Sequence, residues 1–243
     1  HPPLIGDDDR VRLIRRTIDR WSGSAAGRGG LRAVDLGCLE GGLSLEMARC
    51  GMEVLGVEGR EENFRRCQLV EEYFGLPKLS FLQLDVRQLT PSEHGTFDVI
   101  LCCGLLYHLD DPFSFLDRMA ALCRPGGLLF LDTHIAPPDE RSLDDGRFAD
   151  KLSPLESYCT DRGTFEGRWF EEFTGPKGEA EPWAAVGNPR SFWPTEDALL
   201  RALGASGFRD IFKVFGVVDI DRELALRREF SRGYFVAIGG GSG

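Results

Sequence analysis

The chain has 243 residues, of which 42% are hydrophobic, and this is enough for one α/β domain with a sizeable core. Its formal net charge of −10 at pH 7 disfavours broad binding to nucleic acid or to an anionic membrane through bulk electrostatics. No apolar run reaches membrane-spanning length and no secretory leader is recognisable, so we expect a cytoplasmic protein that does not enter a membrane.

Seven cysteines are scattered through the chain, and most lie in apparent core segments. Those in apolar surroundings are Cys38, Cys50, Cys102, Cys103 and Cys123. No Cys-x-x-Cys pair occurs, so the spacing indicates neither a zinc site nor a disulfide framework. We therefore expect reduced thiols, as in a cytosolic protein, and no bound metal.

A helix is predicted over residues 10–21, where Val11, Ile14 and Ile18 recur at helical spacing and arginines fill the other face. His1 is not a natural first residue, and residues 239–243 look like a flexible linker or tag remnant. Both ends are therefore excluded from the fold prediction, which treats residues 1–238 as a single domain.

The most informative segment is a strand over 31–36 that continues through Asp35-x-Gly37-x-x-x-Gly41 into a helix, followed by a second strand that ends in Glu58. Strand, glycine turn, helix, strand and acid form one nucleotide-binding half of an open α/β sheet. The glycine spacing differs from the Gly-x-Gly-x-x-Gly of dinucleotide sites, and no P-loop occurs. Asp35 would repel a pyrophosphate but would suit a cationic ligand. A crossover whose glycine turn binds nothing is the plainer alternative.

The rest of the chain alternates strands with helices. Strands are predicted at 53–58, 79–84, 97–103, 128–132, 208–214 and 231–238, and helices at 43–50, 60–74, 112–123 and 196–206. The sequence Asp111-Pro112 is a helix start with Asp at the N-cap and Pro at the first helical position. This alternation predicts a doubly wound, largely parallel sheet.

Residues 134–193 interrupt the alternation, because they are too long for a plain connection and show little periodicity. An insertion after the fifth strand lies at the carboxyl ends of the strands, where ligands bind, and its many aromatic residues argue against disorder. We expect a cap over a substrate. A subdomain that packs only its own small core is the alternative.

The motifs over residues 31–135 resemble those of the class I S-adenosylmethionine-dependent methyltransferases, in which an acid, x, Gly, x, x, x, Gly ends the first strand. The resemblance implies a Rossmann-like seven-stranded sheet in the order 3-2-1-4-5-7-6, with strand seven antiparallel. It implies S-adenosyl-L-methionine as cofactor and S-adenosyl-L-homocysteine as product. The run Gly-Leu-Leu-Tyr-His-Leu at 104–109 also resembles the branch of tRNA wobble-uridine carboxymethyltransferases and many bacterial small-molecule methyltransferases.

The same resemblance implies the cofactor contacts. Glu58 would accept hydrogen bonds from both ribose hydroxyls, and Asp85 would lie beside the adenine amino group. The full implied set is Asp35, Gly37, Cys38, Gly41, Glu58, Gly59, Asp85, Val86, Cys103 and Gly104. The plainer interpretations are an acid favoured by a helix dipole for Glu58 and a strand-end cap for Asp85.

Candidate catalytic residues follow the fourth and fifth strands. The leaving group of methyl transfer is a neutral thioether that needs no acid, so catalysis is chiefly alignment. A hydroxyl or protonated amine acceptor needs a base, and histidine suits that role near neutral pH. We favour His108 over His134 as this base or as a group that orients the acceptor, and we expect Tyr107 to shape the pocket or to orient the acceptor. Packing beneath the cofactor is the alternative for His108.

In the insertion, charged groups and flat rings occur together, which suits a polar organic molecule. The candidate substrate contacts are Arg168, Trp169, Asn188 and Trp193. A lid core with solvated charges is the alternative. The adjacent acids Glu171 and Glu172 are interpreted as a solvated face rather than as an acid–base pair.

Three functions follow. The first is methyl transfer to a small organic acceptor, at oxygen, nitrogen or carbon, by a monomer or homodimer. The second is a tRNA-modifying (carboxy)methyltransferase; the net charge of −10 opposes it, so no nucleic-acid partner is expected. The arginines that favour this second function are Arg10, Arg12, Arg15, Arg16, Arg222, Arg227, Arg228 and Arg232. The third is a module that binds the cofactor without turnover.

Overall fold

The computed structural model describes residues 9–23, 29–139, 148–173, 183–214 and 232–240. Arg222, Arg227 and Arg228, and residues 241–243 of the predicted linker, lie outside the described residues. Within the described part of the chain, no helix has both the length and the apolar character needed to cross a membrane.

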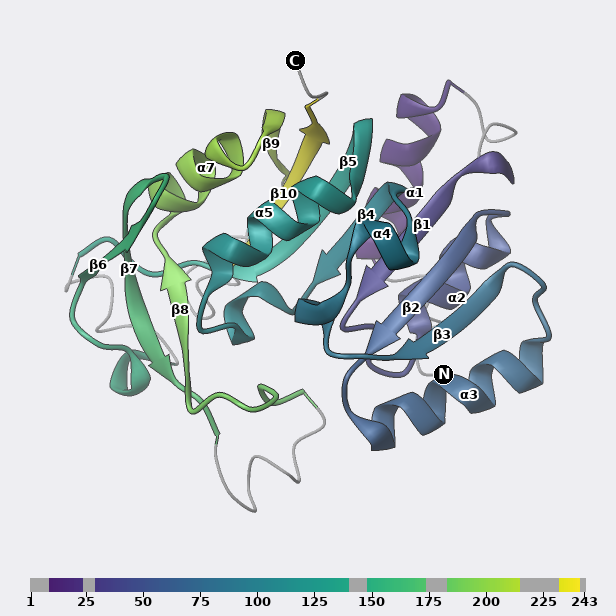
Figure 1. Ribbon diagram of the computed structural model, residues 1–243, viewed down its shortest axis with the longest axis horizontal. Helices are drawn as coiled ribbons and strands as arrows, with labels where there is room; N and C mark the ends of the chain where they lie inside the picture. Colours follow the sequence, from purple (N-terminus) through teal and green to yellow (C-terminus); the bar gives the residue numbers. More distant parts are fainter. Residues whose placement is uncertain (1–8, 24–28, 140–147, 174–182, 215–231, 241–243) are drawn as a thin grey trace.

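Seven strands form the central sheet in the order β3-β2-β1-β4-β5-β10-β9 (Figure 1). Their bounds are β1 Arg32–Leu36, β2 Glu53–Glu58, β3 Leu79–Gln83, β4 Phe97–Cys103, β5 Cys123–His134, β9 Phe208–Val214 and β10 Arg232–Gly239. Neighbours from β3 to β5 pair in parallel, whereas β10 runs antiparallel to both β5 and β9. The strand order and the reversed last strand confirm the predicted sheet.

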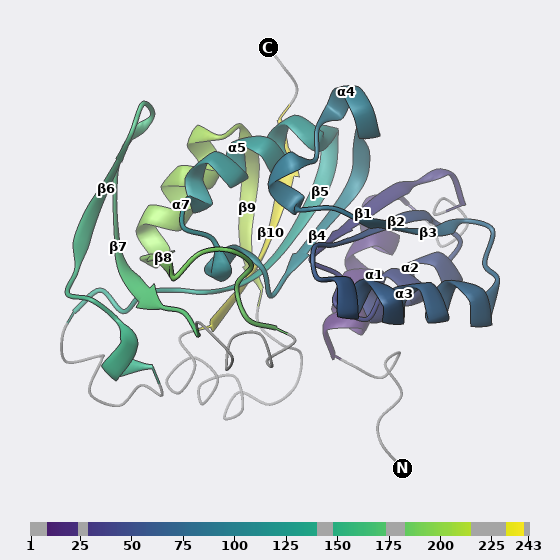
Figure 2. The same cartoon turned by 60° about the horizontal axis from the view of Figure 1, so that its bottom comes forward.

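Helices cover both faces of this sheet (Figure 2). One face carries α1 Asp9–Trp21, α2 Gly42–Arg49 and α3 Glu61–Phe74, and the other carries α4 Pro91–His94, α5 Pro112–Leu122 and α7 Glu196–Ala205. Successive residues of a strand enter opposite layers, so Ala33 packs in the α1–α2 core while Val34 packs in the α5–α7 core. The strands are apolar on both sides because both sides are buried.

The predicted helix starts are present. The Asp111 side chain accepts a hydrogen bond from the backbone N–H of Ser114 at 3.0 Å. Thr195 does the same for Ala198 at the start of α7, at 3.3 Å. Such caps satisfy backbone donors that have no partner inside the helix.

The boundary predicted for strand five was wrong. The strand was expected over 128–132, but β5 begins at Cys123, directly after α5, and runs through Pro125, Gly126 and Gly127. The pairing with β4 steps from Phe97↔Cys123 to Val99↔Leu128, so the extra residues form an irregularity inside the strand. Gly126, at φ 76°, accommodates the left-handed backbone that this requires.

Between β5 and α7 the chain forms a second, antiparallel sheet in the order β6-β7-β8. Its strands are β6 Glu156–Thr160, β7 Gly163–Glu171 and β8 Arg190–Pro194. Phe165 of β7 stacks on Phe113 of α5 at 4.6 Å, which fixes this sheet against the main domain. The described residues of the insertion therefore form a packed sheet, and its role as a substrate cap stays a prediction.

Candidate functional site

The carboxyl ends of β1, β2 and β4 border a crevice of about 980 Å³. Its lining includes ten predicted site residues: Gly37, Glu58, Gly59, Asp85, Val86, Cys103, Gly104, Tyr107, His108 and Asn188. Lining residues that were not predicted as site residues are Arg10, Leu39, Arg60, Arg87, Leu105, Leu109, Arg232 and the segment 183–186. One crevice thus joins seven of the ten predicted cofactor residues to two of the three predicted catalytic residues.

The glycine turn after β1 forms the floor of one end. Gly37 adopts φ 68°, and its N–H and that of Cys38 both donate to the carbonyl of Val57, at 2.9 and 3.1 Å. Gly41 lies outside the lining; a Cβ there would come within 2.5 Å of the Phe81 ring, so its glycine serves packing. The thiol of Cys38 also points away from the lining, to the sulfur of Cys67 at 3.8 Å.

Asp35 lies two residues before Gly37, buried behind the turn rather than on the lining. Burial raises its pKa to about 6, although hydrogen bonding to Ser44 opposes the rise. The Ser44 hydroxyl donates to Asp35 Oδ2 at 2.6 Å. A carboxylate with few local partners is a place where a nearby cation would be stabilised.

Glu58 ends β2 and faces the crevice. Its two oxygens accept the backbone N–H groups of Leu39, at 2.9 Å, and Arg60, at 2.8 Å. Leu39 adopts φ 55°, a conformation unusual outside glycine, and this brings its N–H to Glu58. Burial raises the pKa of Glu58, and these N–H bonds oppose that rise. The carboxylate is held rigidly at the crevice wall.

Asp85 follows β3 and caps the short helix η3 Val86–Gln88. The guanidinium of Arg87 binds both of its oxygens, with Nη2–Oδ2 at 2.6 Å, and these hydrogen bonds lower the pKa of Asp85. Arg87 also donates to the carbonyl of Val186 at 3.2 Å. Arg60 makes a similar contact, because it donates to the carbonyl of Ala184 at 2.8 Å. Two arginines thus hold the segment 183–186 along this end of the crevice.

The other end is formed by the turn after β4, which contains the short helix η4 Leu106–His108. Gly104 adopts φ 93°, and a Cβ there would come within 3.6 Å of both Arg232 Nη2 and Tyr107 Oη. Burial raises the pKa of Tyr107, which keeps its hydroxyl protonated as a possible donor. Tyr107 and His108 therefore lie where a methyl acceptor was expected.

His108 has a carboxylate partner that the sequence did not predict. Its Nδ1 lies 3.0 Å from Oε1 of Glu172, whose side chain is 1% exposed. The interpretation of Glu171 and Glu172 as a solvated face was wrong for Glu172. Glu171 ends β7 exposed, while Glu172 turns inward beneath η4. Alternation at the strand end is the signal that could have separated the two acids.

Two side chains hold the η4 backbone, one from β8 and one from the connection just before it. Asn188 Nδ2 donates to the carbonyl of His108 at 2.9 Å, and Trp193 Nε1 donates to that of Tyr107 at 2.8 Å. Asn188 lines the crevice, as predicted for a substrate contact, whereas Trp193 lies outside it. Trp193 stacks on His134 with ring centroids 4.5 Å apart.

The remaining predicted residues lie outside the crevice lining. His134 is buried at the end of β5, between Trp193 and Tyr107. Arg168 is buried and donates to the carbonyls of Pro137 and Ser153, each at 2.9 Å. Trp169 packs against Phe192 and carries the guanidinium of Arg190 4.0 Å above its ring. These contacts give Arg168 and Trp169 a place in the packing of the second sheet.

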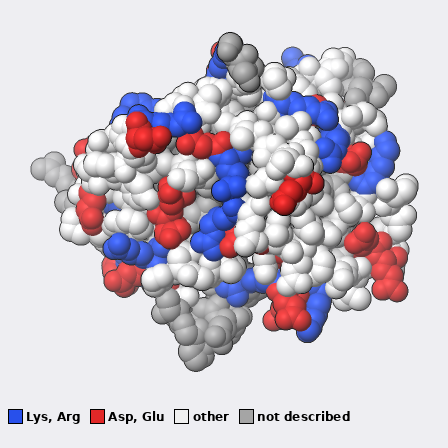
Figure 3. All heavy atoms as spheres, viewed as in Figure 1, with Lys and Arg blue, Asp and Glu red and all other residues white. Residues whose placement is uncertain are grey.

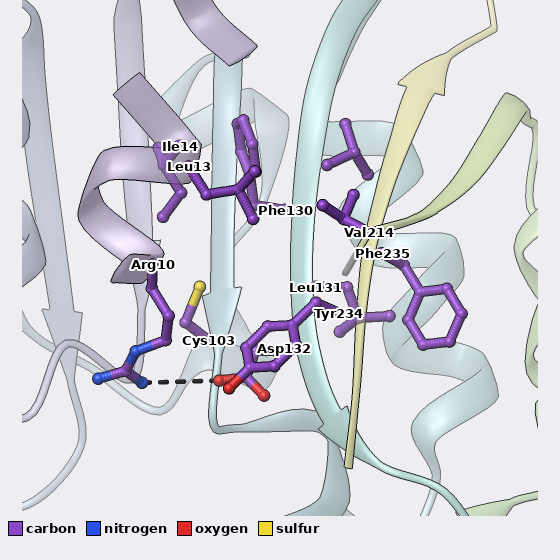
Figure 4. Close-up of a pocket in the computed structure, with 11 residues that line it drawn as sticks. Arg10, Leu13, Ile14, Cys103, Phe130, Leu131, Asp132, Val214, Tyr234 and Phe235 are labelled. Carbon is purple, nitrogen blue, oxygen red and sulfur yellow. Dashed lines mark ion pairs between the residues drawn. The ribbon is translucent and has the colours of Figure 1, made fainter. Parts of the chain in front are cut away.

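A cluster of charged side chains that was not predicted from the sequence lies at the same end of the crevice as Tyr107 and His108. Buried Asp132 binds Arg232 through two contacts, at 2.6 and 2.8 Å, and lies 3.6 Å from Arg10. Figure 4 shows Arg10 and Asp132 at the mouth of a narrow apolar pocket between α1 and β5. Two cations against one carboxylate leave net positive charge here. Residues 10, 132 and 232 carry no local motif that would have linked them.

Comparison with known proteins shows similarity to methyltransferases. A family model described as "Methyltransferase domain" matches residues 7–212. Similar curated proteins include ubiquinone biosynthesis O-methyltransferases of Acinetobacter baylyi, 31% identical over 116 residues (48% of each chain), and of Albidiferax ferrireducens, 33% identical over 130 residues (54% of this chain and 52% of that one). The chain spans about half the length of the curated relatives it matches.

Solved structures share the fold over nearly the whole chain. The N-terminal domain of EvdMO1, solved in the presence of SAH (S-adenosylhomocysteine) and D-fucose, has a TM-score of 0.69 and 27% identity, over 97% of this chain and 84% of that one. The magnesium protoporphyrin IX methyltransferase of Synechocystis, with SAM (S-adenosylmethionine) bound, has a TM-score of 0.55 and 17% identity, over 98% of this chain and 85% of that one, and shows the fold alone.

Proposed function

The chain belongs to the methyltransferase-domain family, and from this premise we propose that it transfers the methyl group of S-adenosylmethionine to a small organic acceptor. The observation that carries the proposal is the continuity of the crevice. A nucleoside-binding end at Gly37, Glu58 and Asp85 runs without interruption into the end that holds Tyr107 and His108.

The nucleoside end fits the cofactor's chemistry. Glu58 presents a fixed acceptor for ribose hydroxyls, and Val86 and Leu105 provide apolar wall for a flat base. The Glu58 carboxylate would oppose a phosphate placed beside it, whereas a sulfonium nucleoside carries none. When bound, this cofactor supplies an electrophilic methyl carbon. Asp35 behind the turn supports a cationic ligand, and Arg10 could pair with a carboxylate at its tail.

The acceptor end favours a small molecule. The side chain of Asn188 binds the η4 backbone, so the chain just before β8 borders this end closely. The same crevice must hold the cofactor as well, and this favours a compact acceptor. Here the protein aligns the acceptor and excludes water, and Tyr107 and His108 are the groups that can exchange a proton with it.

The relatives indicate which acceptors to test first. Those in Acinetobacter and Albidiferax are named O-methyltransferases, and the EvdMO1 domain was solved with a sugar present. Hydroxylated aromatic compounds and sugars therefore head an acceptor panel, followed by amines and thiols. A tRNA acceptor has weaker support, because acidic side chains flank the band of basic ones on the face in Figure 3.

The test has two steps. Calorimetry should detect binding of S-adenosylmethionine and of S-adenosylhomocysteine, and mass spectrometry should then detect a methylated product from the panel. Bulk tRNA at low salt is the comparison substrate. If neither S-adenosylmethionine nor S-adenosylhomocysteine bound, the proposed function would be wrong. Methyl transfer to tRNA with none to any small molecule would replace it with the second function.

A further inference from the structure

A buried carboxylate contacts the histidine at the acceptor end. Glu172 lies just beyond β7, and Oε1 of its side chain is 3.0 Å from Nδ1 of His108. The same Oε1 accepts the hydroxyl proton of Ser191 at 2.8 Å. Buried carboxylates are uncommon unless they are paired, so this contact needs a reason.

The position of Glu172 is fixed from several sides. Its backbone N–H donates to the carbonyl of Pro189 at 3.0 Å, and the N–H of Phe192 donates to that of Leu109 at 2.9 Å. Asn188 holds the carbonyl of His108 from the same strand connection. The carboxylate and the imidazole are therefore both attached to rigid backbone, and their contact does not depend on a flexible side chain reaching across.

The contact sets the tautomer of the ring. A carboxylate only accepts hydrogen bonds, so a neutral His108 facing it carries its proton on Nδ1 and leaves the lone pair on Nε2. His108 lines the crevice with its side chain 15% exposed. Among the described residues Nε2 has no hydrogen-bond partner and is not a buried atom. The free lone pair is thus open to the crevice.

Glu172 is not arranged for stability alone. Its Oε2 is buried, and within the described residues it has no hydrogen-bond partner. A buried, half-satisfied carboxylate costs free energy relative to a neutral side chain of similar shape. Such a cost is expected where charge next to an imidazole serves the chemistry rather than the fold.

We infer that Glu172 is a positioning residue that holds His108 with Nε2 ready to take a proton, and that the acceptor is a hydroxyl compound, the proton-bearing acceptor that heads the panel above. This inference rests on the proposed function. As the new oxygen–carbon bond forms and the carbon–sulfur bond breaks, the electron pair of the latter goes to sulfur. The hydroxyl proton passes to Nε2, and Glu172 stabilises the resulting imidazolium. A thiolate or neutral amine would need none of these groups.

The tautomer can be read without any acceptor. The chain has 4 histidines, so ¹⁵N-histidine labelling with long-range ¹H–¹⁵N correlation spectra resolves each ring, and His108→Ala identifies its signals. We expect Nδ1 protonated in the wild type. Glu172→Met removes the acceptor and should shift His108 toward the Nε2-protonated form. Glu172→Gln keeps an acceptor without charge, and should retain the tautomer. The control is exposed Glu171→Gln, which should change nothing.

The second measurement is kcat and KM with the best hydroxyl acceptor. Glu172→Met should lower kcat about 10- to 100-fold, less than loss of the base itself, with KM for S-adenosylmethionine changed less than about twofold. The kcat of Glu172→Gln should fall between those of Glu172→Met and the wild type. Thermal melting curves show whether each variant is folded. An unchanged His108 tautomer in Glu172→Met, or a kcat within about twofold of wild type, overturns the inference. Failure of the proposed function would appear separately, as absent nucleoside binding in the wild type.

Discussion

The two ends of the crevice are built in different ways. At the nucleoside end, Gly37, Glu58 and Asp85 follow three successive strands, and each carboxylate accepts backbone N–H groups from nearby turns. At the acceptor end, Asn188 and Trp193 bind the η4 backbone from 80 and 86 residues away in the chain. The strand ends place the binding groups of the first end, although Arg60 and Arg87 hold the distant segment 183–186 beside them. At the second end, long-range side-chain contacts hold the backbone that carries Tyr107 and His108.

This difference predicts a division of labour. Changes at the nucleoside end should act on cofactor affinity, because those groups are preformed by the sheet. Changes at the acceptor end should act on turnover, because the contacts there orient reacting groups and leave the nucleoside end untouched.

The largest effect is expected for His108→Ala. If His108 takes the acceptor proton, its loss should reduce turnover by about 10²–10⁴, while affinity for S-adenosylmethionine changes less than about twofold. Steady-state rates and calorimetry measure the two quantities. His94→Ala is the matched control, because His94 ends α4 outside the crevice lining and, among the described residues, its ring nitrogens hydrogen-bond only to Thr90. Near-normal turnover in His108→Ala would remove this residue from the chemistry.

The opposite signature is expected for Glu58→Ala. Loss of a charge-assisted acceptor for the ribose should weaken binding of S-adenosylmethionine by about 1.5–3 kcal/mol, or about 10- to 100-fold. Turnover at saturating cofactor should fall far less, because Glu58 touches no reacting atom. Exposed Glu62 of α3 provides the control as Glu62→Ala. Unchanged calorimetric affinity in Glu58→Ala would refute the ribose assignment.

The same contrast explains how much could be predicted from the sequence. The central sheet and the lining residues Gly37, Glu58, Asp85 and Gly104 were all predicted, because strand ends and glycine turns leave local patterns. The second sheet was not predicted as regular structure. Its strand β7 alternates only in part, with Arg168 buried where a polar residue suggests exposure.

The missed site residues depend on contacts between distant segments. Arg10 and Arg232 meet only because α1 and β10 both lie near the end of β5, where Asp132 is buried. The Glu171 and Glu172 pair looks like surface charge in the sequence, and only the burial of one member distinguishes them. No local rule links a carboxylate to a histidine 64 residues away.

The smallest effect is a pH dependence at the nucleoside end, and it tests whether Asp35 acts on the ligand from behind the turn. Burial raises the pKa of Asp35 to about 6, so the free protein favours the protonated form at mildly acid pH. A bound cation would favour the carboxylate and lower that pKa. Affinity for S-adenosylmethionine should therefore rise with pH, by up to about tenfold between about pH 5 and pH 7, and then level off.

The stability of the ligand-free protein should change in the opposite direction. A raised pKa means that the folded state binds this proton more tightly than the unfolded state, so the stabilisation present below the ordinary value of 3.8 is lost as pH rises through about 6. Asp35→Asn removes both effects, which separates them from Glu58, whose pKa burial also raises. The affinity for S-adenosylhomocysteine, which lacks the sulfonium charge, should rise less steeply with pH than the affinity for S-adenosylmethionine. If the affinity for S-adenosylmethionine rose equally with pH in the wild type and in Asp35→Asn, other groups would hold the cation. The affinity of the nucleoside end would then come from hydrogen bonds alone.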